Sequence, residues 1–115
     1  MIVRRAFEFE AAHRLPEHSG KCRELHGHSY RLVVAVDRPV EPRSGMALDF
    51  ADLKRVVTRD VVELVDHLNL NDRIDNPTAE RVAEWIWGRL APGLPGLVEI
   101  ELHETRSCSV VYRGE

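Results

Sequence analysis

Two segments of alternating apolar and polar residues, joined by a short polar loop, constrain the fold of this chain most. Residues 2–13 alternate and end at His13, and residues 28–38 alternate again from His28 onward. Because strand side chains alternate between the two faces of a sheet, each segment is expected to be a strand with one apolar face. His26 and His28 are two residues apart, so their rings are expected to point the same way.

Two amphipathic segments follow the strands. The first is expected to begin near Asp49, a good N-cap, and to carry apolar residues at helical spacing as far as Leu68. The second is expected to begin after Thr78, another N-cap candidate, and to stop at Pro92 and Gly93. Both patterns predict helices with one buried side.

Two more strands are expected near the C-terminus, at residues 97–104 and 108–113, and Cys108 is interpreted as a core residue. The resulting order is β-β-α-α-β-β. It predicts an α+β fold, a four-stranded antiparallel sheet with two helices on one face. No linker or repeat divides residues 1–115, so one domain is expected. Its sheet edges would invite pairing with another copy.

Composition excludes several functions. The chain has 115 residues and a net charge of −3, which argues against a main role in gripping nucleic acid or an anionic membrane. No apolar run approaches the roughly 20 residues of a membrane span, and the N-terminus lacks an apolar signal core. We therefore expect a cytoplasmic protein whose two cysteines are reduced.

Three histidines and one cysteine form the strongest candidate for a chemical site. His26 and His28 from one strand and His13 from a neighbouring strand offer three imidazoles to a zinc ion. Three protein ligands leave an open position, which is typical of catalytic zinc. Cys22 is therefore either a fourth ligand that closes the site or an acid/base beside the metal. The alternative is that these are ordinary surface histidines that bind no metal.

Other polar residues give weaker signals. Asp66 and His67 are expected at the end of the first helix, where adjacent side chains do not face each other, so their partners would come from different directions. Glu104 ends a strand on its apolar face, where it could accept two hydrogen bonds from the edge of a ring or lie solvated at the strand end. Glu24, two residues before His26, is an alternative acid/base or a solvated loop charge.

Short motifs along the whole chain resemble the 6-pyruvoyl-tetrahydropterin synthase / 6-carboxy-tetrahydropterin synthase family. In order they are FEFEAAH at 7–13, Cys22 with HGHSY at 26–30, LDFADLK at 48–54, DHLNLN at 66–71, NPTAE at 76–80, WIW at 85–87, ET at 104–105 and YRG at 112–114. No single motif is decisive, but their occurrence in this order makes the resemblance specific.

The resemblance implies roles for individual residues. The zinc ligands it implies are His13, His26 and His28. The catalytic residues it implies are Cys22, Asp66 and His67. Glu104 would anchor the pterin ring, and Thr78 belongs to a motif near the pterin pocket. Candidates to hold a triphosphate are Arg14, Lys21 and Arg23.

The resemblance also implies the tunnelling fold, in which three subunits join their sheets into a barrel and two trimers stack as a homohexamer with active sites between subunits. The implied reaction converts 7,8-dihydroneopterin triphosphate to 6-carboxy-5,6,7,8-tetrahydropterin, acetaldehyde and triphosphate, for queuosine and related deazapurine pathways. The three residues between Cys22 and His26 resemble the carboxy type. A 6-pyruvoyl-tetrahydropterin synthase is the alternative enzyme. A closed, non-catalytic zinc-binding module is the alternative of another class.

Overall fold

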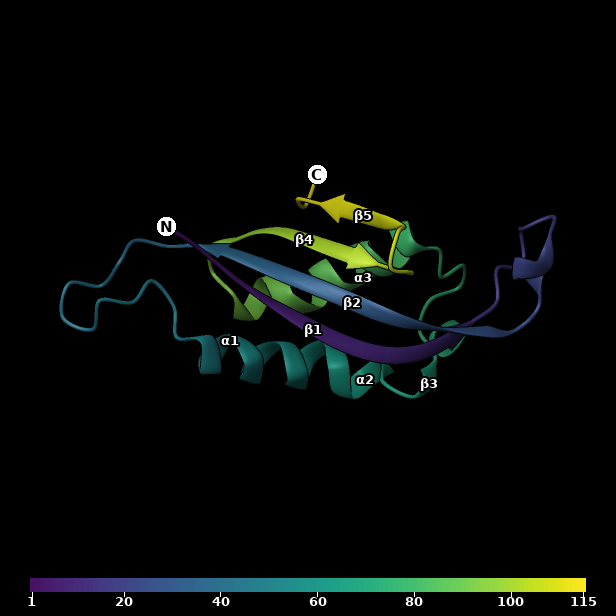
Figure 1. The fold of residues 1–115 in the computed structure, drawn as a ribbon, viewed down its shortest axis with the longest axis horizontal. Helices are drawn as coiled ribbons and strands as arrows, with labels where there is room; N and C mark the ends of the chain where they lie inside the picture. Colours follow the sequence, from purple (N-terminus) through teal and green to yellow (C-terminus); the bar gives the residue numbers. More distant parts are fainter.

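Five strands form one sheet, and the three α-helices lie against one of its faces (Figure 1). This computed structural model describes residues 1–115. The strands are β1 (Ile2–His13), β2 (His26–Asp37), β3 (Leu68–Asn69), β4 (Leu97–His103) and β5 (Ser109–Tyr112). The helices are α1 (Phe50–Val57), α2 (Glu63–Val65) and α3 (Ala79–Leu90). The expected α+β class and its four antiparallel strands are confirmed.

The sheet has the order β3-β1-β2-β4-β5. The sequence pattern gave no sign of β3, a two-residue strand that pairs in parallel with β1 at Ala11 and Ala12. The long pair of β1 and β2 sets His13 directly opposite His26 and Phe9 opposite Tyr30. The histidines that end one strand and begin the other therefore lie side by side.

The core lies between the sheet and the helices. Phe9 and Tyr30 stack there with ring centroids 5.0 Å apart, and both are buried. Apolar residues of β2, β4, α1 and α3 complete this layer. The opposite face of the sheet carries most of the charged strand residues, and we call it the open face.

The first helical segment is shorter than its apolar stripe predicts. Asp49 caps α1 by accepting a hydrogen bond from the N–H of Ala51, as expected. The helix then widens into a π-helical segment, Thr58–Val62, and α2 ends at Val65 rather than at Leu68. Phe50 and Leu68, at the two ends of the expected stripe, are exposed.

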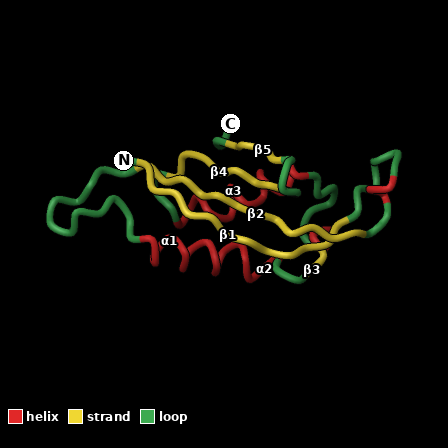
Figure 2. The backbone as a smooth tube through the Cα atoms, in the orientation of Figure 1, coloured by secondary structure: helices red, strands yellow, loops and turns green.

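Thr78 caps α3 by accepting from the N–H of Arg81, as the sequence predicts. The molecule is elongated, 54 × 24 × 24 Å along its principal axes. The loop at 14–25 and the loop at 38–49 lie at its opposite ends (Figure 2). None of the helices has the length and apolar character needed to cross a membrane.

Candidate metal centre and adjoining cavity

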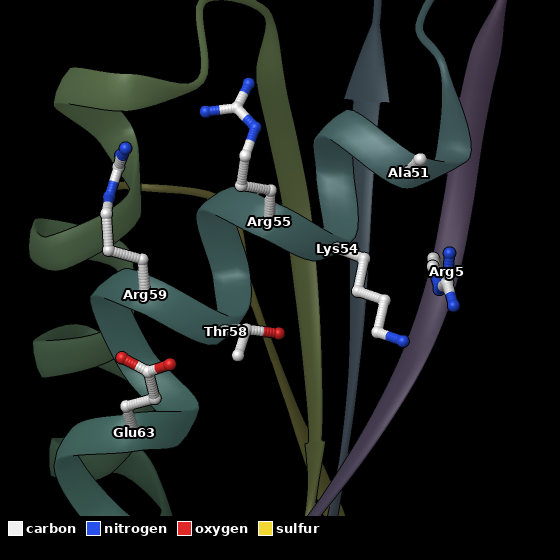
Figure 3. Close-up of a pocket in the computed structure, with 7 residues that line it drawn as sticks. All are labelled: Arg5, Ala51, Lys54, Arg55, Thr58, Arg59 and Glu63. Atoms are coloured by element: carbon white, nitrogen blue, oxygen red, sulfur yellow. The ribbon is translucent and has the colours of Figure 1, made fainter.

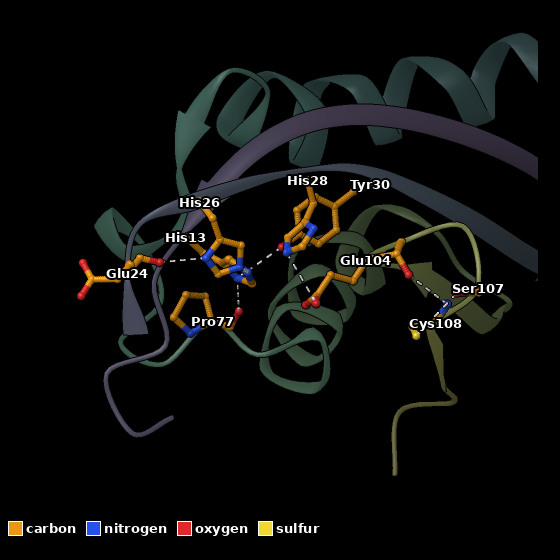
Figure 4. A network of polar contacts seen from close by, with 10 residues as sticks. His13, Glu24, His26, His28, Tyr30, Pro77, Glu104, Ser107 and Cys108 are labelled. Atoms are coloured by element: carbon orange, nitrogen blue, oxygen red, sulfur yellow. Dashed lines mark hydrogen bonds and ion pairs between the residues drawn. The ribbon is translucent and has the colours of Figure 1, made fainter. Parts of the chain in front are cut away.

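Three histidine side chains converge at the end of the sheet near the loop at 14–25 (Figure 4). One ligand nitrogen from each of His13, His26 and His28 lies within 4.8 Å of the others. The strand register explains the cluster, because His13 and His26 are cross-strand partners and His28 is two residues further along β2. We call these three residues the histidine cage. Cys22 and Glu24 contribute no side-chain atom to it.

The hydrogen bonds of the cage fix which ring nitrogens are free. His13 Nδ1 lies 2.8 Å from the carbonyl oxygen of Pro77, and His26 Nδ1 lies 2.8 Å from that of Glu24. A carbonyl oxygen only accepts, so each Nδ1 carries the hydrogen and each Nε2 presents a lone pair. Carbonyl oxygens of this kind typically orient metal-binding histidines.

These free nitrogens fit a metal ion. The Nε2 atoms of His13 and His26 lie only 3.0 Å apart, although both present lone pairs that repel each other. The Nε2 atom of His28 is buried and has no hydrogen-bond partner. A cation held among the three nitrogens would remove the repulsion between the two lone pairs and would give His28 Nε2 a partner. Neutral imidazole is a common ligand of zinc.

Burial keeps His13, the most buried of the three histidines, neutral. His13 is fully buried, and this desolvation lowers its pKa below the ordinary value. The hydroxyl of Tyr30 lies 3.3 Å from His13 Nδ1, and burial raises the pKa of Tyr30, so this hydroxyl keeps its proton. Sequence reasoning missed both neighbours of the ring. The Pro77 contact is made by a backbone oxygen, for which no side-chain signal exists.

A cavity of about 320 Å³ adjoins the cage. Its lining includes Cys22, Thr78, Glu80 and Glu104. Glu104 is half-buried rather than solvated at the strand end, and its Oε1 lies 3.6 Å from His28 Nε2. The structure therefore joins six of the residues singled out from the sequence into one region: the three cage histidines, Cys22, Thr78 and Glu104.

Cys108 lines the same cavity as Cys22 and is exposed, so its interpretation as a core residue is wrong. β5 begins only at Ser109, and Cys108 belongs to the turn before it. Its carbonyl oxygen accepts a hydrogen bond of 3.1 Å from the N–H of Glu104. This turn therefore helps to hold Glu104 at the cavity.

Asp66 and His67 meet each other but do not line this cavity. Because α2 ends at Val65 and His67 has a φ of +61°, the pair lies in a turn, and the expectation that these neighbours cannot face each other is wrong. His67 Nδ1 lies 3.1 Å from Asp66 Oδ1, which also accepts from the N–H of Glu10 at 2.9 Å. These hydrogen bonds, first the one from Glu10, lower the pKa of Asp66. The His67 side chain remains 78% exposed.

The largest cavity, about 570 Å³, lies elsewhere, on the outer side of α1 (Figure 3). Its cationic lining residues are Arg5, Lys54, Arg55 and Arg59. The two arginines of the helix already pair with acidic neighbours, Arg55 with Asp52 and Arg59 with Asp60. Since none of the residues singled out for chemistry lies here, size alone does not identify the candidate site.

Known proteins are similar to this chain in sequence and in fold. The sequence profile of the 6-pyruvoyl tetrahydropterin synthase family matches residues 2–115. A Synechocystis protein named 6-carboxy-5,6,7,8-tetrahydropterin synthase is 43% identical over 96% of this chain and 92% of its own length. A Pyrococcus furiosus dihydroneopterin monophosphate aldolase is 43% identical over 87% and 82%. The solved Caenorhabditis elegans 6-pyruvoyl tetrahydropterin synthase has a TM-score of 0.89 at 30% identity and covers 100% and 96% of the two chains.

Proposed function

The chain belongs to the 6-pyruvoyl tetrahydropterin synthase family, and we propose that it is a zinc-dependent 6-carboxy-5,6,7,8-tetrahydropterin synthase. Its substrate would be 7,8-dihydroneopterin triphosphate, and its product would serve queuosine or related deazapurine synthesis. The observation that carries this proposal is the open side of the histidine cage. Three imidazoles converge there without a fourth protein ligand, next to a cavity that also holds Cys22 and Glu104.

In this proposal each residue has one task. A zinc ion held by the cage would supply Lewis acidity toward the side-chain hydroxyls of the substrate. Glu104 accepts hydrogen bonds from the amino and ring N–H groups of the pterin, a charge-assisted pairing. Cys22 acts as general base and removes a proton from the substrate side chain, and His67, oriented by Asp66, is the second acid/base. Thr78, the N-cap of α3, borders the pterin.

Assembly of several copies is part of the proposal, because the proposed catalytic residues fall into two groups. Asp66 and His67 lie toward one edge of the sheet, and Cys22 lies toward the other. Asp66 and His67 are held against Glu10 of β1. Cys22 lines a cavity that includes Ser109 and Val110 of β5. Outside its short pairing with β3, β1 has a free edge, and β5 has another. Head-to-tail pairing of β1 with β5 of the next copy would unite the two groups, as in a closed trimeric ring.

The charges beside these two edges are complementary. The α1 cavity beside β1 is lined by four cations, of which Arg5 and Lys54 have no acidic partner. On α3, Trp87 marks the side next to β5, because its ring packs edge-on against that of Tyr112. Glu80 and Glu84 lie seven and three residues before Trp87, so they share this side of the helix. Pairing between copies would bring these carboxylates toward the α1 cations, and a stack of two such trimers would be the homohexamer.

Product analysis tests the reaction. Purified zinc-loaded protein is incubated with 7,8-dihydroneopterin triphosphate, and pterins and acetaldehyde are identified by mass spectrometry. We expect 6-carboxy-tetrahydropterin, acetaldehyde and triphosphate. Accumulation of 6-pyruvoyl-tetrahydropterin without acetaldehyde would assign the pyruvoyl reaction instead. Absence of any dihydropterin turnover, with zinc in a saturated four-ligand site, would favour the non-catalytic zinc module.

Two cysteines of the same cavity provide a matched pair of variants. Cys22→Ala should retain zinc and lose turnover, because it removes the proposed base but no cage ligand. Cys108→Ala should retain both, since this thiol has no proposed chemical role. Loss of zinc from Cys22→Ala would make the cysteine a ligand and contradict the open site.

Mixed oligomers test the shared active site. Cys22→Ala and His67→Ala chains should each be inactive alone, because each lacks a different half of the proposed site. Co-refolding them in equal amounts should restore up to roughly a quarter of the wild-type activity, because sites in a closed ring then combine halves at random. No recovery in mixed oligomers of confirmed composition would place all catalytic residues within one copy.

A further inference from the structure

A second polar cavity, about 340 Å³ in volume, lies on the open face of the sheet. None of its six lining residues is apolar: Glu8, Ser29, Arg31, His103, Thr105 and Arg106. The strand register explains this grouping, because Arg31 of β2 is the cross-strand partner of both Glu8 and His103. We call it the back cavity.

Two arginines of the back cavity differ from the others nearby. Arg4 and Arg113, on the same face, are already paired with Glu101 and Glu99. The guanidinium groups of Arg31 and Arg106 have no hydrogen bond or ion pair. Unpaired guanidinium groups that border one cavity are suited to bind an oxyanion, because each offers several N–H donors in a planar fork.

The other lining groups favour an anion as well. Glu8 is the only carboxylate among the lining residues, and the nearby Glu10 is already engaged, because it accepts a hydrogen bond from the hydroxyl of Ser29 at 2.7 Å. His103 donates to Glu101 at 2.6 Å and keeps this carboxylate engaged as well. The hydroxyl of Thr105 accepts from the N–H of Cys108 and still has its own proton to donate. The cavity therefore has an excess of unpaired hydrogen-bond donors.

We propose that the back cavity binds an oligophosphate through Arg31 and Arg106. Its volume exceeds the need of a single phosphate group, and its lining has no apolar surface for a base or a pterin. The site is separate from the histidine cage but adjacent to it. Ser29 follows His28 on β2, so strand alternation places the back cavity and the cage on opposite faces of the sheet.

Titration calorimetry of the intact zinc-loaded protein with inorganic tripolyphosphate tests this proposal at low salt. The double variant Arg31→Gln, Arg106→Gln should bind tripolyphosphate at least tenfold more weakly. Added salt should weaken the binding of tripolyphosphate by the wild type. Arg43→Gln, on the distant loop at 38–49, is the matched control and should leave the affinity for tripolyphosphate unchanged. Binding by the double variant at wild-type strength, or no binding by the wild type at millimolar concentration, would overturn the proposal.

Glu8→Gln keeps the test valid even where the double variant folds poorly. It removes the one carboxylate that lines the cavity, so tripolyphosphate should bind several-fold more tightly. Unchanged or weaker binding would contradict the assignment.

A triple variant of the cations near the cage, Arg14→Gln with Lys21→Gln and Arg23→Gln, should bind tripolyphosphate as tightly as the wild type. Loss of binding in this variant would place the anion site on the catalytic face instead of in the back cavity. A nucleoside triphosphate should bind as tightly as tripolyphosphate, and binding of the nucleotide alone would also refute the proposal. These readouts are independent of turnover.

Discussion

Replacing His28 by alanine should cost the protein most of its affinity for zinc. Four-ligand zinc sites bind with an apparent free energy of about 10–16 kcal/mol, so one ligand accounts for about 2.5–4 kcal/mol. On this scale His28→Ala weakens zinc binding by roughly 100- to 1,000-fold. The fold itself should suffer little, because the His28 Nε2 atom has no hydrogen bond to lose.

His13→Ala should weaken zinc binding similarly but also destabilise the metal-free protein. The His13 ring is fully buried, and its removal leaves the carbonyl oxygen of Pro77 and the hydroxyl of Tyr30 without this partner. An unsatisfied buried group costs about 1–3 kcal/mol. Both variants remove a metal ligand, but only His13→Ala also removes a buried group that contacts its neighbours. Comparing the two variants therefore separates the ligand role of these histidines from the structural role of His13.

Competition with a chromophoric chelator gives the zinc affinity, and thermal unfolding with and without chelator gives the stability. At equal free zinc, a 100-fold weaker site loses about 2.7 kcal/mol of metal-dependent stabilisation. His103→Ala is the matched control, because this histidine lies on the open face against Glu101 and should leave zinc affinity unchanged. Wild-type zinc affinity in His28→Ala would refute the three-histidine cage.

Three further changes test other parts of the structure. Asp66→Asn should lower kcat at least tenfold while zinc content stays unchanged, because the histidine beside it loses its charged partner; unchanged kcat would remove the carboxylate from the mechanism. Gly96→Ala should destabilise the protein by at least about 2 kcal/mol, since a non-glycine residue at φ +88° is strained and its Cβ would overlap the carbonyl oxygen of Asp37. Gly88→Ala, in α3 with open space around it, should stabilise by about 0.5–1 kcal/mol, and denaturant unfolding compares the two. In metal-free protein the unfolding free energy should fall as the pH is lowered through 6.5, because the lowered pKa of His13 lets the unfolded chain take up the proton first; His13→Gln should flatten this slope.

The strands were predictable because their signal is local. Alternation identified β1 at residues 2–13, and the same rule identified β2 and β4 to within two residues at each end. The N-caps at Asp49 and Thr78 were predictable for the same reason, since a cap depends on a side chain and the backbone two or three residues away.

The errors concern features that tertiary contacts decide. The apolar stripe continues to Leu68, but the helix stops at Val65 because the next residues bond to Glu10 of β1. The left-handed conformation of His67 has only a weak sequence signal, since residues other than glycine rarely adopt a positive φ. Cys108 precedes an apolar pair, Val110 and Val111, yet it lies in the turn before an edge strand, where apolar character does not require burial.

The histidine cage could be predicted from the sequence because it depends on the same strand register as the core. His13 faces His26 in the pairing that also sets Phe9 opposite Tyr30. A slip of one residue would turn the buried side chains of one strand to the open face and expose its apolar set. The same slip would separate the ring nitrogens of His13 and His26, which are now 3.0 Å apart. The free energy that holds the apolar face in register therefore also holds the metal ligands together. Sequence changes that preserve the core pattern of β1 and β2 should preserve the cage.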